Sequence, residues 1–162
     1  SPEEAKEIVS WAKFPPQGGR GFDNAGPDAD YLMSDPVEYT RHANQETFVV
    51  VQVEDKEAIE SINQIASVEG IDVLFIGPAD LSLSYGVFPD FNHEKIENAI
   101  ERVAEAAKKY GKWWGMPFAT EEQGRSLIEK GARFLTGGSE VGVIKEGFQE
   151  KKRVFKALQR LV

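Results

Sequence analysis

Hydrophobic positions along this chain follow two alternating patterns. Four short runs are rich in β-branched and aromatic residues, and segments with an apolar residue every three or four positions lie between them. The first run is apolar at almost every position, which is typical of a strand covered on both faces. The predicted strands are Phe48–Val53, Val73–Ile76, Trp113–Phe118 and Phe134–Thr136.

Capping residues mark the ends of the predicted helices. Ser1 is a good N-cap, and Pro2 and Glu4 fit the first turn of the helix that ends near Lys13. Gly111 stands at the C′ position of the helix with the clearest apolar stripe, residues 92–110. The other predicted helices are 36–44 with Asp35 as N-cap, 55–68, 121–130 with a Thr120–Gln123 capping box, and one from the Ser139 cap to about Leu161.

Two segments stand out from this regular pattern. Residues 17–35 are rich in Gly, Pro and Asp and are predicted to form a loop, which is long for a connection inside one domain and points to function or an interface. The last helix is predicted to carry an apolar side made of Val141, Ile144, Phe148, Phe155 and Leu158.

The order of elements predicts an α/β fold. A helix followed by four strand–helix units implies parallel strands with helices outside the sheet. The pattern fits an open doubly wound sheet or half of an eight-fold barrel, and periodicity does not choose between them. A chain of 162 residues fits one domain. Residues 1–47 would hold a helix, a long loop and a short helix, and residues 48–162 the four units.

Composition narrows the classes of partner. The net charge is −8, and nucleic acid is therefore an unsuitable partner because phosphate contacts need clustered Lys and Arg. No run approaches the roughly 18–20 apolar residues of a membrane span. The absence of cysteine excludes disulfides and thiolate metal sites. The expected location is the cytoplasm. An acidic substrate would need a local positive charge, for which a divalent cation is one candidate.

Two carboxylates follow neighbouring predicted strands. Glu54 follows the first strand, and Asp80 follows the second after a tight Gly-Pro turn. In parallel α/β folds the active site lies at the carboxyl ends of the strands. Adjacent strands lie about 4.8 Å apart, so these side chains can share one cation. Oxygen ligands without Cys or clustered His favour Mg²⁺ or Mn²⁺. Taken singly, each carboxylate is more often an ordinary surface residue.

Three sequence blocks then connect these residues to a family. The blocks are Val50–Glu54, Ile65–Asp72 and Phe75–Ser82, with weaker similarity at Phe14–Gly21 and Gly131–Glu140. Together they resemble the HpcH/HpaI family of class II pyruvate aldolases, which includes dihydroxyheptenedioate and dehydrodeoxyglucarate aldolases. The resemblance implies a (β/α)8 TIM barrel, in which this chain carries the helix after strand four and strand–helix units five to eight. It also implies homo-oligomers.

The same resemblance implies a site and a reaction. Glu54 and Asp80 would bind a divalent cation: Mg²⁺, Mn²⁺ or Co²⁺. The implied substrate-binding residues are Gln52, Gly77, Pro78 and Ala79. The reaction would be reversible aldol cleavage of a carbon–carbon bond between pyruvate and an aldehyde, with the pyruvate enolate stabilised by the cation as a Lewis acid.

The chain departs from the family in one large respect. The family's general-base His and enolate-binding Arg belong to a part of its pattern that this chain lacks. Neither His42 nor His93 occupies the equivalent place, and Arg20 belongs to another segment. No catalytic residue is therefore identified, and we expect weak or no activity from this chain alone. The aromatic stretch 113–118 replaces a smaller aliphatic strand, which leaves substrate size open.

Two alternatives remain open. A non-catalytic half-barrel would bind a metal or keto acid, or assemble through its exposed strand edge and apolar interior. A carbon–carbon lyase of the citrate lyase β-subunit type would use acyl-CoA, and the chain has no basic loop suited to the CoA diphosphate.

Overall fold

The computed structural model of this chain describes residues 1–159 and has an α/β fold built on parallel strands. β1 (Val50–Val53), β2 (Val73–Ile76) and β3 (Trp113–Gly115) form one sheet in that order. β4 (Pro117–Phe118) and β5 (Thr136–Gly137) form a separate parallel pair. The predicted α/β class with parallel strands is confirmed.

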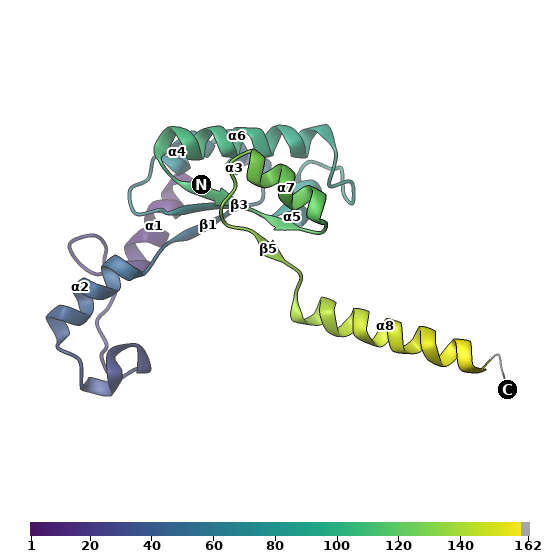
Figure 1. Ribbon diagram of the computed structural model, residues 1–162. Helices are drawn as coiled ribbons and strands as arrows, with labels where there is room; N and C mark the ends of the chain where they lie inside the picture. Colours follow the sequence, from purple (N-terminus) through teal and green to yellow (C-terminus); the bar gives the residue numbers. More distant parts are fainter. Residues whose placement is uncertain (160–162) are drawn as a thin grey trace.

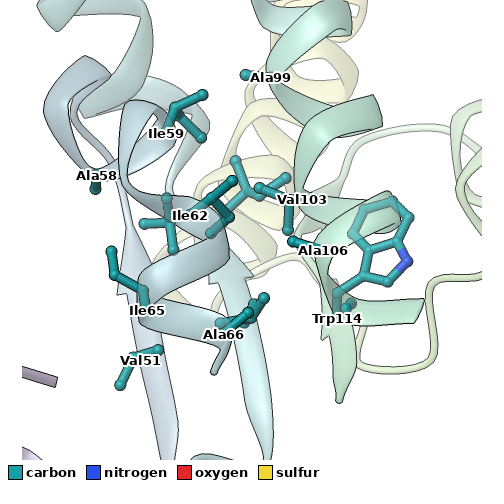
Figure 2. Packing of buried hydrophobic residues seen from close by; sticks show 14 of the residues in the cluster. Val51, Ala58, Ile59, Ile62, Ile65, Ala66, Ala99, Val103, Ala106 and Trp114 are labelled. Carbon is teal, nitrogen blue, oxygen red and sulfur yellow. The ribbon is translucent and has the colours of Figure 1, made fainter. Parts of the chain in front are cut away.

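Three helices cover one face of the larger sheet: α3 (Lys56–Glu60), α4 (Ile62–Ala66) and α6 (Glu94–Tyr110) (Figure 1). Figure 2 shows Ile62 and Ile65 near Val51 of β1, and Val103 near Trp114 of β3. All five of these side chains are buried in one core. The helices therefore cover the face of the sheet on which Val51, Leu74 and Trp114 lie.

The opposite face of this sheet is only partly covered within residues 1–159, where Val73 is buried on it. Gln52 is exposed on it, and Phe48 and Trp113 are 59% and 60% exposed. The Phe134 ring lies edge-on to Phe48 and Phe75, with ring centroids 6.1 and 5.7 Å apart. The first strand, predicted to be covered on both faces, is thus covered on one face only by the described residues.

Local capping signals are realised where they were predicted. In α1 (Pro2–Ala12), Ser1 Oγ accepts from Glu4 N at 3.2 Å, and the Ser1 ammonium donates to the Glu4 carboxylate at 2.6 Å. Asp35 caps α2 (Pro36–Glu46) by accepting from two backbone N–H groups. Gly111 ends α6 in the left-handed conformation, with φ of 65°. These three helix ends are confirmed.

Two predicted helices differ in detail. The segment 55–68 forms two short helices, because the backbone leaves helical geometry at Ser61 (φ −95°, ψ 9°) and this bend buries Ile59 and Ile62 completely. Thr120 is the N-cap of α7 (Glu121–Glu129), and its Oγ1 accepts from Gln123 N as predicted. A complete capping box would also need Gln123 Oε1 to accept from Thr120 N, but this oxygen accepts from Ala119 N instead. The capping box is therefore only half formed.

The predicted strand 113–118 divides into β3 and β4. Because residue 115 is glycine, the backbone of Phe134 lies so close to it that a Cβ added at Gly115 would overlap the Phe134 carbonyl. The Arg133 and Phe134 N–H groups both donate to Trp114 O, at 2.9 and 3.2 Å. Regular parallel pairing between β4 and β5 begins only after this close approach, at Pro117 and Thr136. The last strand is therefore 136–137 rather than the predicted 134–136.

Two segments extend from the sheet and its helices (Figure 1). The predicted loop 17–35 contains a 3-10 element, η1 (Pro27–Leu32), in which Asp30, Tyr31 and Leu32 have φ of 52°, 51° and 74°. α8 (Glu140–Gln159) begins as predicted after Ser139 but projects away from the sheet, and no residue of that range is buried. Its apolar side is therefore exposed in this chain. The predicted end near Leu161 lies outside the described residues.

Candidate functional site

Strand pairing brings the predicted site residues to one edge of the sheet. Val53 pairs with Ile76 in parallel register, and Gly77 N donates to Val53 O at 3.1 Å. Glu54 and Gly77 therefore leave the carboxyl ends of β1 and β2 side by side. This is the edge at which parallel α/β folds place their ligands.

Gln52, Glu54 and Gly77 form a close cluster. Gln52 Nε2 donates to Glu54 Oε2. A Cβ added at Gly77 would lie 2.6 Å from Glu54 Oε2 and 2.9 Å from Gln52 Nε2, closer than real side chains approach. Gln52 is exposed and Glu54 is half-buried. Glycine at position 77 thus makes room for two polar side chains that remain accessible to a ligand.

Asp80 lies on the turn that follows this cluster. Gly77 is the N-cap of α5 (Pro78–Ser84), and Leu81 N donates to Gly77 O at 3.0 Å. The N–H groups of Ala79 and Asp80 belong to the first helical turn, where no intrahelical acceptor exists. The Asp80 side chain is exposed, while the completely buried Leu81 and Ser82 hold the turn against the core.

The donor set suits a hard cation. Two carboxylates and an amide oxygen at one sheet edge are ligand types that Mg²⁺ and Mn²⁺ accept, with water or substrate in the remaining positions. Across residues 1–159, no three His, Asp or Glu side chains gather in one metal-binding group. Glu54 and Asp80 each follow one of the two strand ends, and their binding of a cation stays a prediction.

The two histidines and Arg20 have other surroundings. His93 caps α6, with Nδ1 accepting from Lys95 N at 3.1 Å, and His42 is exposed on α2. The Arg20 guanidinium lies 4.5 Å from the centre of the Phe14 ring and 3.4 Å from the Asp28 carboxylate.

The structure has a hollow beside the Pro78–Ala79 turn that the sequence did not predict. It has a volume of about 420 Å³, and its walls include Asn92, Phe118, Thr120 and Gln123. The aromatic stretch 113–118 leaves substrate size open in the sequence, and Met116, Pro117 and Phe118 of that stretch line this hollow. Nothing in the sequence indicated that the segment around residues 91–92 would lie opposite that stretch.

The sequence model of one family, described as HpcH/HpaI aldolase/citrate lyase, matches residues 1–146. A 5-keto-4-deoxy-D-glucarate aldolase from Enterobacter sp. (strain 638) is 32% identical over 154 residues. That match covers 95% of this chain and 59% of the relative. The chain therefore spans less than two thirds of the length of this relative.

Solved structures agree with the sequence match. An HpcH/HpaI aldolase from Desulfitobacterium hafniense DCB-2 is 30% identical, with a TM-score of 0.87 over 96% of this chain and 60% of that chain. An HpcH/HpaI aldolase/citrate lyase family protein from Burkholderia cenocepacia J2315 is also 30% identical, with a TM-score of 0.86 over 96% of this chain and 62% of that one. The chain belongs to the HpcH/HpaI aldolase/citrate lyase family.

In residues 1–159, every helix is too short or too polar to cross a bilayer.

Proposed function

We propose that this chain carries the metal-binding half of a class II aldolase site that makes or breaks a carbon–carbon bond between pyruvate and an aldehyde. The observation that carries the proposal is the cluster of Gln52, Glu54 and Gly77 at the carboxyl ends of β1 and β2. Family membership supports the reaction class, since relatives are named as aldolases.

In this proposal Glu54 and Asp80 hold one divalent cation, Mg²⁺ or Mn²⁺, with Co²⁺ as a third candidate. When bound, the cation supplies Lewis-acid stabilisation of the negative charge that develops on the keto oxygen of pyruvate. The Gln52 amide orients the keto acid. The backbone of Gly77, Pro78 and Ala79 lies against its carboxylate, where the first-turn N–H groups of α5 can donate.

We further propose that the proton is moved by groups outside this chain. His93 accepts a backbone hydrogen bond at the start of α6, and Arg20 is held against Phe14 and Asp28. Both are therefore engaged away from the strand-end cluster. Activity would require the part of the aldolase that the relatives have and this chain does not span.

We also propose the finer architecture. The four parallel strand–helix units would be units five to eight of a (β/α)8 barrel, with α1 as the helix after strand four. The open sheet face, lined by Phe48, Phe75 and Trp113, would then face the barrel interior. The apolar side of α8 would lie in a homo-oligomer interface, because large exposed apolar surfaces are unfavourable in isolated proteins.

Metal titration tests the core of the proposal. Mn²⁺ binding to the chain would be measured calorimetrically for the parent and for Glu54→Gln and Asp80→Asn. Each variant should weaken binding at least about tenfold, the equivalent of ~1.4 kcal/mol. Glu57→Gln is the matched control, since Glu57 is an exposed carboxylate on α3 near Lys56. Parent-like affinity in Glu54→Gln would contradict the metal assignment.

A further inference from the structure

The hollow beside the Pro78–Ala79 turn borders the proposed pyruvate site directly. Its volume is about 420 Å³, enough for several non-hydrogen atoms beyond a pyruvyl group. One wall comes from the β2–α5 turn and the other from β4 and the start of α7. A substrate whose pyruvate end lies at Ala79 would extend its other end into this space.

The walls of the hollow are uncharged. Every lining residue is apolar or a neutral polar residue, with Phe91, Met116 and Phe118 on the apolar side and Asn92, Thr120 and Gln123 on the polar side. Gln123 Oε1 already accepts from Ala119 N at 2.8 Å, so its Nε2 is the end that can donate to a ligand. The hollow can thus bind hydroxyl or carbonyl groups and short alkyl groups.

The surroundings do not favour an anion at this place. The first turn of α7 carries Glu121 and Glu122, which oppose the positive end of the helix dipole. Lys130, in the adjoining hollow, is paired with Glu97 at 2.6 Å. A carboxylate placed here would lose water without gaining a cation from residues 1–159, in a chain whose net charge is −8.

Phe118 forms part of the wall of the hollow. A Cβ added at Gly137 would lie 2.8 Å from the Phe118 ring, and one at Gly124 would lie 3.3 Å from it. The two glycines therefore let the ring lie between α7 and β5. Held in this way, the Phe118 ring occupies space at the wall of the hollow that a smaller side chain would leave free.

We propose that this hollow is the aldehyde subsite and that it selects uncharged aldehydes with short chains over aldehydes that carry a carboxylate. The inference rests on the proposed function, because it takes the turn at Pro78–Ala79 as the pyruvate site. It sets this chain apart from its named relatives, since 5-keto-4-deoxy-D-glucarate is a dicarboxylic acid with a second carboxylate on the aldehyde side.

A matched pair of aldols tests the selection. 4-Hydroxy-2-oxoheptanoate and 4-hydroxy-2-oxoheptanedioate share the pyruvate half and differ at the far end, where one has a methyl group and the other a carboxylate. Each would be titrated with Mg²⁺ into the isotope-labelled chain and followed by NMR at the amides of Ala119 and Gln123. The monoacid should bind at least about tenfold more tightly. Equal or tighter binding of the dioate would overturn the inference.

Two variants sharpen the result. Asn92→Lys adds a cation at the rim and should shift the preference toward the dioate at least about fivefold, whereas Gln64→Lys, on the exposed side of α4, should leave it unchanged. An unshifted preference in Asn92→Lys would also overturn the inference. Pyruvate alone, followed at the Gly77 amide, reports on the proposed function separately, so a failure there is distinguishable from a failure of the selection.

Discussion

At the scale of single residues, Gly77 links the two sides of the candidate site. It follows β2, is the N-cap of α5 and lies against the side chains of Gln52 and Glu54. The nearest atoms are the polar ends that are proposed to meet cation and substrate. The need for glycine here is steric, because position 77 has no positive φ that would demand it.

Gly77→Ala should therefore impair the site and the fold together. The added Cβ must displace Glu54 Oε2 and Gln52 Nε2, and overpacking of this kind costs about 1–3 kcal/mol. We expect Mn²⁺ affinity to fall at least about tenfold in calorimetric titration. Gly21→Ala is the control, since a Cβ there meets no atom within 4 Å. Unchanged Mn²⁺ binding in Gly77→Ala would contradict the cluster geometry.

A second residue-scale feature lies in the extension that precedes the sheet. The Tyr39 hydroxyl donates to Asp28 at 2.6 Å and holds the pKa of that carboxyl below its ordinary value, with Arg20 as a smaller contributor. A carboxylate with a lowered folded-state pKa stabilises the fold above its unfolded-state pKa. That contribution is lost as the pH falls through the folded-state pKa.

Tyr39→Phe should raise the pKa of Asp28 toward its ordinary value, because the main hydrogen bond to the carboxylate is removed. Carboxyl carbon NMR during an acid titration measures this directly. Tyr31→Phe is the matched control, as Tyr31 lies in the same extension and is 64% exposed. If the Asp28 titration is the same in both variants, the hydrogen bond is not the cause of the shift.

At the scale of elements, α6 packs across two strands of the sheet and against three neighbouring helices. It contacts β2, β3, α3, α4 and α5, and its apolar stripe is buried as the sequence predicts. The same apolar period in α8 is exposed along its whole described length. Periodicity therefore predicted both helices correctly as helices, but it did not say which one finds a partner in this chain.

Ile96→Ala should destabilise the fold by about 2–5 kcal/mol, because Ile96 is completely buried on α6 and the change leaves a cavity. Urea denaturation followed by circular dichroism gives the free energy of unfolding. Ile128→Ala removes the same atoms from a side chain that is 50% exposed on α7, and should change that free energy by no more than about 0.5 kcal/mol. Similar losses in both variants would argue against this core assignment.

At the scale of the whole molecule, two apolar surfaces are left without a covering element among the described residues. One is the open face of the β1–β2–β3 sheet, and the other is the side of α8 that carries Ile144, Phe148 and Phe155. Surfaces of this kind mark contacts with other polypeptides. The proposed homo-oligomer uses the second of them.

Phe148→Asp should shift the chain toward smaller assemblies in sedimentation velocity, because a charge on the apolar side of α8 opposes its burial. Gln149→Asp adds the same charge one position away and should leave the assembly unchanged. A parent chain that sediments as a monomer, or a Phe148→Asp variant that sediments like the parent, would contradict the proposed role of α8.

The sequence by itself determined the features that depend on neighbouring residues. Ser1, Asp35 and Gly111 fixed helix ends because capping groups act on backbone atoms within the same turn. The alternation of strand and helix fixed parallel strands, because a helix between two strands returns the chain in the same direction. The three-block resemblance identified the family, which the comparison confirms over residues 1–146.

Only the tertiary structure decided how distant segments meet. The approach of Phe134 to Gly115 divides β3 from β4, and the pairing of β1 with β2 places Gln52 and Glu54 against Gly77. The exposed side of α8 and the uncharged hollow at Pro78 depend in the same way on which surfaces face each other. Contacts between residues far apart in the chain arise from packing of the whole molecule, and local patterns carry no record of them.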